Sequence, residues 1–167
     1  ETISKTKRSD LYFLIVGSGT ELTRVKSWFK KNKPQNATLI PMLTKIDYDK
    51  LLAACDVGLI FLNKNFTIPN YPSRLLSYLE MKMPVITATD FNSDIGKDVE
   101  KNKCGFAVLS GDINGMHHAI NRLMDEVVLF NEMKENSWNF LNRDFHVDQS
   151  SKLIMQSKNK KTILNHI

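Results

Sequence analysis

The sequence has little cysteine and no long apolar run. Its only two cysteines, Cys55 and Cys104, stand far apart and outside any CxxC or cysteine–histidine ligand spacing. This excludes a disulfide scaffold and a cysteine-ligated zinc site, and we expect both thiols to be free, buried and in a reducing compartment. Apolar runs such as 11–16 and 57–62 span about six residues, whereas a membrane-spanning helix needs roughly 20, so none is expected.

What remains is the composition of an ordinary globular domain. Hydrophobic residues make up 42% of the 167 positions, aromatic residues 9% and charged residues 25%. These values exclude a disordered chain and a collagen-like repeat. The length corresponds to about one domain. We therefore expect residues 1–167 to form a single domain, with helices only from about residue 128 onward.

Basic residues outnumber acidic ones, with 23 against 18 and a net charge of +5. They gather at the two ends of the sequence, as Lys5, Lys7 and Arg8 and as Lys152, Lys158, Lys160 and Lys161. A phosphorylated ligand, an anionic membrane surface or simple solvation of the ends would each fit this charge. Neither an RNP-like aromatic strand nor a helix-turn-helix pattern is present, so no nucleic-acid partner is expected.

Short apolar segments alternate with amphipathic ones along the chain. The apolar segments predict strands at 11–16, 38–42, 57–62, 84–88 and 105–109. Helices are predicted after Gly19, from an N-cap at Asp47, across 72–81, over 94–103 and from an N-cap at Asp112. Repeated strand–helix units imply a parallel sheet with helices on both faces. We therefore predict an α/β fold with a Rossmann-like parallel sheet of about five strands.

Ligands of such sheets bind outside the carboxyl ends of the strands. This directs attention to the loops at 17–21, 42–47, 63–74, 88–95 and 109–113. One of the helices that follow these loops departs from the charge pattern of the others. The helices near Asp47, Asp94 and Asp112 begin with acid, as the helix dipole favours, whereas the first turn after Pro72 has none and carries Arg74.

This acid-free helix start has the features of a phosphate site. Pro72 suits the first helical position, and Asn70 is a nearby capping residue. Free backbone N–H groups, the Ser73 hydroxyl and the Arg74 guanidinium are expected to lie close together there. The preceding loop of nine residues, 63–71, is longer than usual, and long loops are often functional. The alternative is that Arg74 is a solvated surface charge.

Gly17-Ser18-Gly19 forms a strand–glycine–helix junction. Such a junction can bring backbone close to a ligand, and it can equally be a tight turn. Leu22 stands where the third glycine of a dinucleotide fingerprint would be, which argues against a standard NAD site. No Walker lysine motif is present.

The sequence contains no recognisable catalytic set. It has no nucleophile elbow, no HExxH motif and no paired carboxylates. His117 and His118 have apolar helical neighbours and are expected at the edge of the core, while His146 and His166 have no partner at ligand spacing. We therefore expect neither a metal site nor catalytic residues in this chain.

The run 71–86, YPSRLLSYLEMKMPVI, resembles the signature of retaining, family-four glycosyltransferases. That signature combines a proline-serine-lysine/arginine helix start, a Leu-Leu pair and a Pro-Val-Ile strand. Residues 15–19 resemble the family's strand–glycine turn, 55–60 its alanine-aspartate-valine strand and 104–108 its late glycine strand, with Gly111-Asp112 opening the next helix. The resemblance extends over about 11–145.

The resemblance implies the GT-B fold, two Rossmann-like domains facing a cleft, with this chain as the C-terminal, donor-binding domain. It implies a nucleotide-diphosphate sugar as substrate without a further cofactor. The sugar would pass, with retention and without metal, to a glycan or lipid-linked acceptor in cell-surface polysaccharide synthesis. A cytoplasmic location is implied, with the inner membrane face as an alternative surface for the basic tail. The implied donor-binding residues are Gly17, Ser18, Gly19, Met42, Leu43, Pro69, Asn70, Tyr71, Pro72, Ser73, Arg74, Leu75 and Ser77.

The sequence departs from the family in two respects. Two glutamates that many members carry, eight positions apart, fall on Pro69 and Ser77, which leaves the donor open. The family's C-terminal domain also begins with one more strand and helix, which residues 1–10 cannot supply. We therefore expect a partial domain that is inactive alone and belongs with an N-terminal acceptor domain. The alternatives are another GT-B enzyme, such as a sugar-nucleotide epimerase, and a non-catalytic nucleotide-sugar-binding domain.

Overall fold

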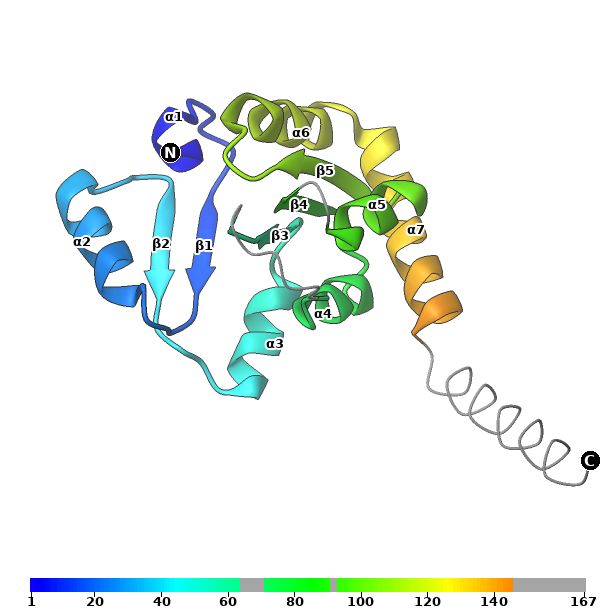
Figure 1. The fold of residues 1–167 in the computed structure, drawn as a ribbon, viewed down its shortest axis with the longest axis horizontal. Helices are drawn as coiled ribbons and strands as arrows, with labels where there is room; N and C mark the ends of the chain where they lie inside the picture. Colours follow the sequence, from blue (N-terminus) through cyan, green and yellow to red (C-terminus); the bar gives the residue numbers. More distant parts are fainter. Residues whose placement is uncertain (64–70, 91–92, 146–167) are drawn as a thin grey trace, which may run out of the picture.

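The computed structural model describes residues 1–63, 71–90 and 93–145 and shows an α/β fold (Figure 1). Its strands are β1 (Phe13–Val16), β2 (Ala37–Ile40), β3 (Gly58–Phe61), β4 (Val85–Thr89) and β5 (Gly105–Leu109). Its helices are α1 (Thr2–Lys5), α2 (Leu22–Asn32), α3 (Lys45–Ala53), α4 (Arg74–Glu80), α5 (Asp94–Lys101), α6 (Ile113–Asp125) and α7 (Val127–Asp144). The predicted strands and the helices between them are confirmed, and α1 is an addition. Of the helices expected from about residue 128 onward, the part beyond residue 145 lies outside the described residues.

The strands form two hydrogen-bonded sheets, and within each sheet they are parallel. β1 pairs with β2, from Phe13 opposite Ala37 onward. β4 lies between β3 and β5 in the second sheet. The predicted number and direction of strands are therefore confirmed. The expected single sheet is interrupted between β1 and β3, because no strand of the described residues pairs with the facing edges of these two strands.

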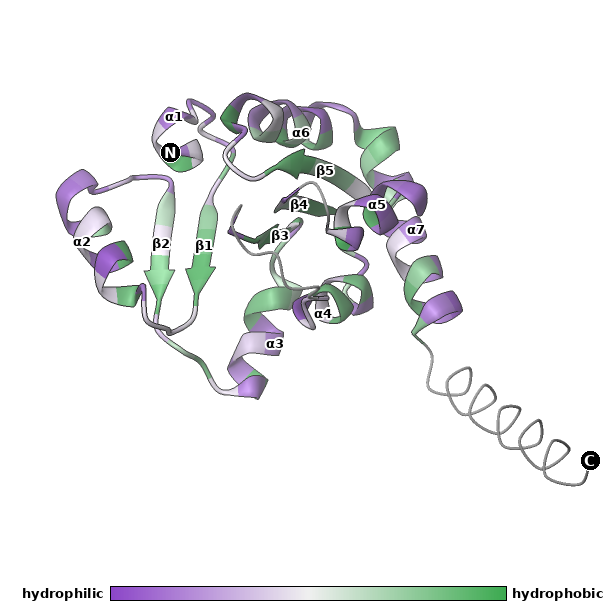
Figure 2. Ribbon diagram, in the orientation of Figure 1, coloured by the Kyte–Doolittle hydropathy of each residue, from purple (hydrophilic) through white to green (hydrophobic). Residues whose placement is uncertain are grey.

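Helices cover both faces of the second sheet. Alternate residues of β4 enter different clusters, with Ile86 packing on one face and Val85 on the other, and every residue of β4 is buried. Figure 2 shows the strands as mainly hydrophobic. One cluster joins β1, β2 and β4 to α6 and α7; it consists of Phe13, Ala37, Ile86, Ala88, Met116, Ala119, Ile120, Leu123 and Met133. The other joins β3, β4, α4, α5 and α7; it consists of Ile60, Leu75, Leu79, Val85, Ile95, Val99, Cys104 and Phe140.

The start of α3 differs from the sequence prediction. Thr44, rather than Asp47, is the N-cap residue. The Thr44 hydroxyl accepts the Asp47 N–H at 3.2 Å and donates to the Asp47 carboxylate at 2.8 Å. In a capping box the acidic residue at the third helical position accepts the backbone N–H of the N-cap residue, whereas here Asp47 accepts the Thr44 hydroxyl. The predicted cap of α6 is confirmed, because Asp112 accepts the Gly115 N–H at 2.8 Å.

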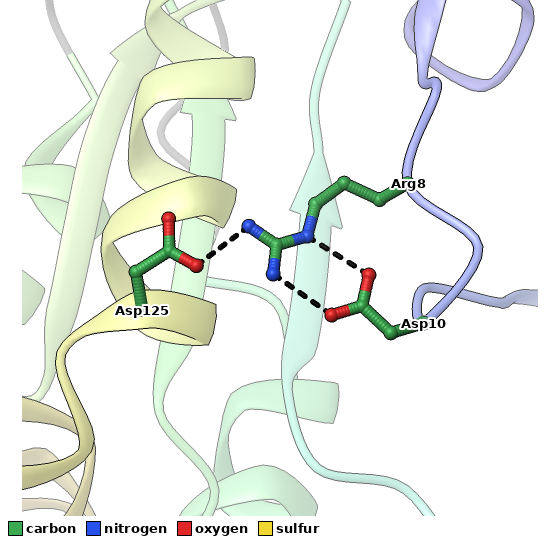
Figure 3. A network of polar contacts seen from close by, with 3 residues as sticks. All are labelled: Arg8, Asp10 and Asp125. Atoms are coloured by element: carbon green, nitrogen blue, oxygen red, sulfur yellow. Dashed lines mark hydrogen bonds and ion pairs between the residues drawn. The ribbon is translucent and has the colours of Figure 1, made fainter.

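Arg8 connects the segment before β1 to the end of α6 (Figure 3). Its guanidinium donates two hydrogen bonds to Asp10, at 2.9 and 2.8 Å, and one to Asp125, at 2.7 Å. The hydrogen bonds from Arg8 lower the pKa of Asp10. Arg8 is therefore not one of the free basic charges that the sequence suggests near the start of the chain.

The two cysteines have different surroundings. Cys104 is fully buried in the core, and burial raises its pKa to about 12. Cys55 is a free thiol too, but it is only half-buried. Both are free, as expected, while full burial applies to Cys104 alone. Among the helices of the described residues, none is long and apolar enough to cross a membrane.

Candidate functional site

The implied donor-binding residues lie in two groups. The first group is formed by the loops that follow β1 and β2, at 17–19 and 42–43. The second lies at the start of α4, the helix that comes after β3, and covers 71–77. Pro69 and Asn70 lie outside the described residues. Both groups therefore follow the carboxyl ends of parallel strands, where ligands of such sheets bind.

In the first group, the backbone itself is open to a ligand. Gly17 and Gly19 have φ angles of 146° and 151°, which disfavour any residue with a Cβ. A Cβ added to either would meet no atom within 4 Å, so both face open space. The Ser18 hydroxyl donates to the sulfur of Met42 at 3.7 Å, which brings the two loops together. Met42 is exposed, and Leu43 is half-buried.

In the second group, Ser73 and Arg74 are exposed and unpaired. Ser73 is the N-cap of α4, but its hydroxyl makes no capping hydrogen bond. Arg74 makes no hydrogen bond or ion pair with any residue in 1–63, 71–90 or 93–145, and the first turn contains no acid. The helix begins later than predicted. Leu75 N–H donates to Pro72 O at 3.0 Å, so Pro72 belongs to a tight turn before the helix and not to its first position.

Other residues of the second group face protein. Leu75 is fully buried in the core, so its side chain is not open to a ligand. Tyr71 donates to the carboxylate of Asp98 at 3.3 Å, and its ring packs on Phe145. Burial, followed by the charge of Asp98, raises the pKa of Tyr71. Ser77 is half-buried within α4. Among the described residues of this group, Ser73 and Arg74 are therefore the ones whose side chains are exposed and have no hydrogen-bond or ion-pair partner.

Tyr78 fixes α4 against β3, and sequence reasoning did not find it. Its hydroxyl donates to Leu59 O at 3.2 Å, and burial raises its pKa to about 12. A Cβ added to Gly58 would lie 2.4 Å from the Tyr78 ring. A glycine inside an apolar strand often marks such a close approach, so Gly58 was the available signal.

The histidines and the other potential metal ligands of the described chain lie apart from one another. No group of three or more His, Cys, Asp or Glu residues in 1–63, 71–90 and 93–145 could hold a metal ion. His117 is half-buried and His118 exposed on α6, as predicted for residues at the edge of the core. A hollow of about 610 Å³ lies at the amino ends of β1 and β2, where it is lined by Ile3 and Trp28 among others. It is therefore separate from both groups.

Comparison with known proteins identifies the type of fold. No family model and no curated protein matches the chain. Sucrose-phosphate synthase from Thermosynechococcus elongatus matches 90% of this chain with a TM-score of 0.71 and 15% identity. WaaG, a glycosyltransferase involved in lipopolysaccharide biosynthesis, matches 80% with a TM-score of 0.58 and 16% identity. The fold resembles that of GT-B glycosyltransferase domains.

The two matched proteins are much longer than this chain. The chain spans 38% of the length of the synthase and 34% of that of WaaG. At such identities the likeness shows the fold alone. The assignment to family four and to the C-terminal half of a GT-B protein stays a prediction.

Proposed function

We propose that this chain is the donor-binding part of a glycosyltransferase, with a nucleotide-diphosphate sugar as its substrate. The observation that carries the proposal is the exposed, unpaired Arg74 beside Ser73. These residues follow the carboxyl end of a parallel strand, in a fold like that of two glycosyltransferases. An unpaired guanidinium there, without a neighbouring carboxylate in the first turn, favours an anionic ligand.

In this proposal the diphosphate lies against the start of α4. The Arg74 guanidinium and the Ser73 hydroxyl donate hydrogen bonds to phosphate oxygens. When the bond between sugar and diphosphate breaks, negative charge develops on the departing phosphate, and Arg74 stabilises it. The nucleoside extends toward Met42 and Leu43, where the open backbone of Gly17 and Gly19 allows close approach. Transfer is proposed to proceed with retention and without a metal.

The acceptor side is proposed to come from an N-terminal domain of the same protein. Both structural neighbours are much longer than this chain, which supports such a division. The proposed acceptor is a glycan or a lipid-linked sugar in cell-surface polysaccharide synthesis, at the cytoplasmic side of the membrane. The involvement of WaaG in lipopolysaccharide biosynthesis supports this class of acceptor.

Calorimetric titration of the intact protein with UDP, GDP and ADP tests the donor site. A hydrogen bond to a charged group contributes roughly 1.5–3 kcal/mol, so Arg74→Ala is expected to weaken diphosphate binding about tenfold or more. Arg122→Ala is the matched control, because it removes a guanidinium that is already paired with Glu126 near the far end of α6. Equal affinities of the two variants, or no binding of any diphosphate by the wild type, would contradict the proposal.

One residue favours binding without transfer as a second candidate. Ser77 stands where the resemblance places a carboxylate, and a hydroxyl supplies a weaker hydrogen bond to a ribose or sugar. Incubation of the intact protein with the sugar nucleotide it binds separates the two candidates. Release of free diphosphate with an acceptor present supports transfer, whereas binding without release supports the non-catalytic domain.

A further inference from the structure

The hollow of about 610 Å³ lies beside α1, the end of α2 and the starts of β1 and β2 (Figure 1). Its volume is within the range of ligand pockets, roughly 300–1,000 Å³. It lies at the amino ends of β1 and β2, whereas both groups of implied donor-binding residues follow the carboxyl ends of strands. The proposed donor site therefore leaves this hollow unused.

The lining of the hollow is basic. Lys7, Arg8 and Lys33 contribute cations, and no Asp or Glu among the described residues lines it. Arg8 is already paired with Asp10 and Asp125 (Figure 3). Lys7 and Lys33 are exposed, and neither makes an ion pair with any residue of 1–63, 71–90 or 93–145. The hollow thus offers two uncompensated ammonium groups, which favour an anionic ligand.

Uncharged polar groups lie next to these lysines. The hydroxyls of Ser4 and Ser9 line the hollow and have no hydrogen-bond partner among the described residues. The indole N–H of Trp28 likewise donates to no residue of the described chain. A hydroxyl both donates and accepts, while an indole N–H only donates. This combination suits a ligand that carries hydroxyl groups of its own.

Two aromatic rings give the hollow an apolar part. The ring of Trp28 is half-buried and meets Phe29 edge to face, with 5.2 Å between the ring centroids. Tyr12 is 55% exposed, and its hydroxyl lies 2.5 Å from that of Thr38. Both rings are therefore held in place while part of each stays uncovered. Such rings contact apolar surface beside polar groups, and the C–H face of a sugar ring supplies that surface.

Hydrogen bonds connect the walls of the hollow. The side-chain amide of Asn36 donates to Ile3 O at 3.3 Å, which ties the segment before β2 to α1. The Phe13 N–H donates to Asn36 O at 2.9 Å, and the side chain of Asn32 donates to Trp28 O at 2.8 Å. Little ordering is then needed when a ligand binds, which lowers the free-energy cost of binding.

We propose that this hollow binds an acidic saccharide, a sugar chain whose rings carry carboxylate or phosphate groups. Lys7 and Lys33 pair with the acidic group, and Trp28 packs on the C–H face of a ring. A flat lipid surface contacts protruding groups, whereas Trp28 is half-buried in a hollow, so a saccharide fits better. A role in retaining a growing glycan rests on the proposed function, but the binding itself does not.

Calorimetric titration of the intact protein with tetragalacturonate, maltotetraose and inorganic phosphate tests the ligand class. Maltotetraose has the same number of rings without the charge, and phosphate supplies charge alone. Two charge-assisted contacts are expected to make tetragalacturonate bind at least about tenfold more tightly than either. Equal binding of maltotetraose or of phosphate, or no binding of tetragalacturonate, would overturn the proposal.

Two double variants test the lysines. Lys7→Gln with Lys33→Asn removes both charges, and asparagine tolerates the left-handed backbone of Lys33, whose φ is 45°. Lys26→Gln with Lys30→Gln is the matched control, since each stands two positions from Trp28, about 200° around α2, and neither lines the hollow. The first pair should weaken tetragalacturonate binding about tenfold and the control should leave it unchanged. Equal affinities of the two double variants would contradict the assignment.

The indole N–H signal of Trp28 in a nitrogen-15 correlation spectrum shows where the saccharide binds. The signal is assigned by its loss in Trp28→Phe, which keeps an aromatic ring against Phe29. Tetragalacturonate is expected to shift it, whereas UDP, which is proposed to bind at Arg74, should not. The two sites are thus tested separately. An unshifted signal at saturation, or a shift caused by phosphatidylglycerol vesicles and not by the saccharide, would overturn the proposal.

Discussion

Ser137 joins α7 to the turn before β4 through a buried hydrogen bond. Its hydroxyl lies 2.8 Å from Met83 O and 2.9 Å from Met133 O, and the side chain is fully buried. Ser137→Ala removes the only donor to Met83 O among the described residues. Met133 O keeps a partner, because it accepts a backbone hydrogen bond within α7. A buried carbonyl left without a partner costs about 1–3 kcal/mol. We therefore expect the variant to unfold at lower urea concentration and lower temperature.

Ser27→Ala is the matched control for this measurement. Ser27 is an exposed residue inside α2, so the same substitution there gives the same gain in helix propensity without loss of a buried bond. The difference in unfolding free energy between the two variants isolates the hydrogen bond. In a chain of this size, each kcal/mol of lost stability lowers the melting temperature by about 2–4 °C. Equal stability of the two variants would refute the role given to Ser137.

Three further predictions concern a strand, a helix and the thiols. Gly105→Ala should cost about 3 kcal/mol or more in urea unfolding, because its Cβ would collide with Val85 O; near-wild-type stability would contradict this. Asp112→Ala should lower stability by about 1 kcal/mol, whereas Asp112→Asn keeps the cap of α6, and equal losses would speak against capping. At pH 8, a thiol reagent should modify Cys55 in the native protein but Cys104 only after unfolding, since burial raises the Cys104 pKa to about 12; rapid native labelling of both would contradict that burial.

The sequence predicted the helices and strands better than it predicted how the strands pair. Continuous apolar runs marked the strands because strands covered on both faces carry few polar residues. Asp112 was identified as a cap because it directly precedes Ile113 and the apolar residues that follow. Thr44 was missed because Asp47 stood nearer the apolar residues of α3, and an acid is favoured in the first turn of a helix as well. Periodicity alone could not predict the interruption between β1 and β3, because it reports which residues are buried and not which edges pair.

In the candidate site, too, local sequence predicts some features, while others depend on the fold. The first turn of α4 contains no acid, as the sequence shows directly, while the role of Arg74 in anion binding stays a prediction. The donor-binding residues implied at 71–77 were all taken to face a ligand. Leu75, however, lies with Leu79, four residues further on, on the inner face of α4. Helical spacing would have separated these positions from Ser73. Tyr71 could not be assigned in this way, because its partner Asp98 belongs to another helix.

The open position of Arg74 follows from how α4 is held. Leu75 and Leu79 anchor one face of the helix in the core, and the Tyr78 hydroxyl ties it to the edge of β3. With that face fixed, Arg74 is left in solvent without a partner in the described chain. The position of Arg74 therefore depends on the packing of Leu75 and Leu79 and on the bond from Tyr78 to Leu59 O.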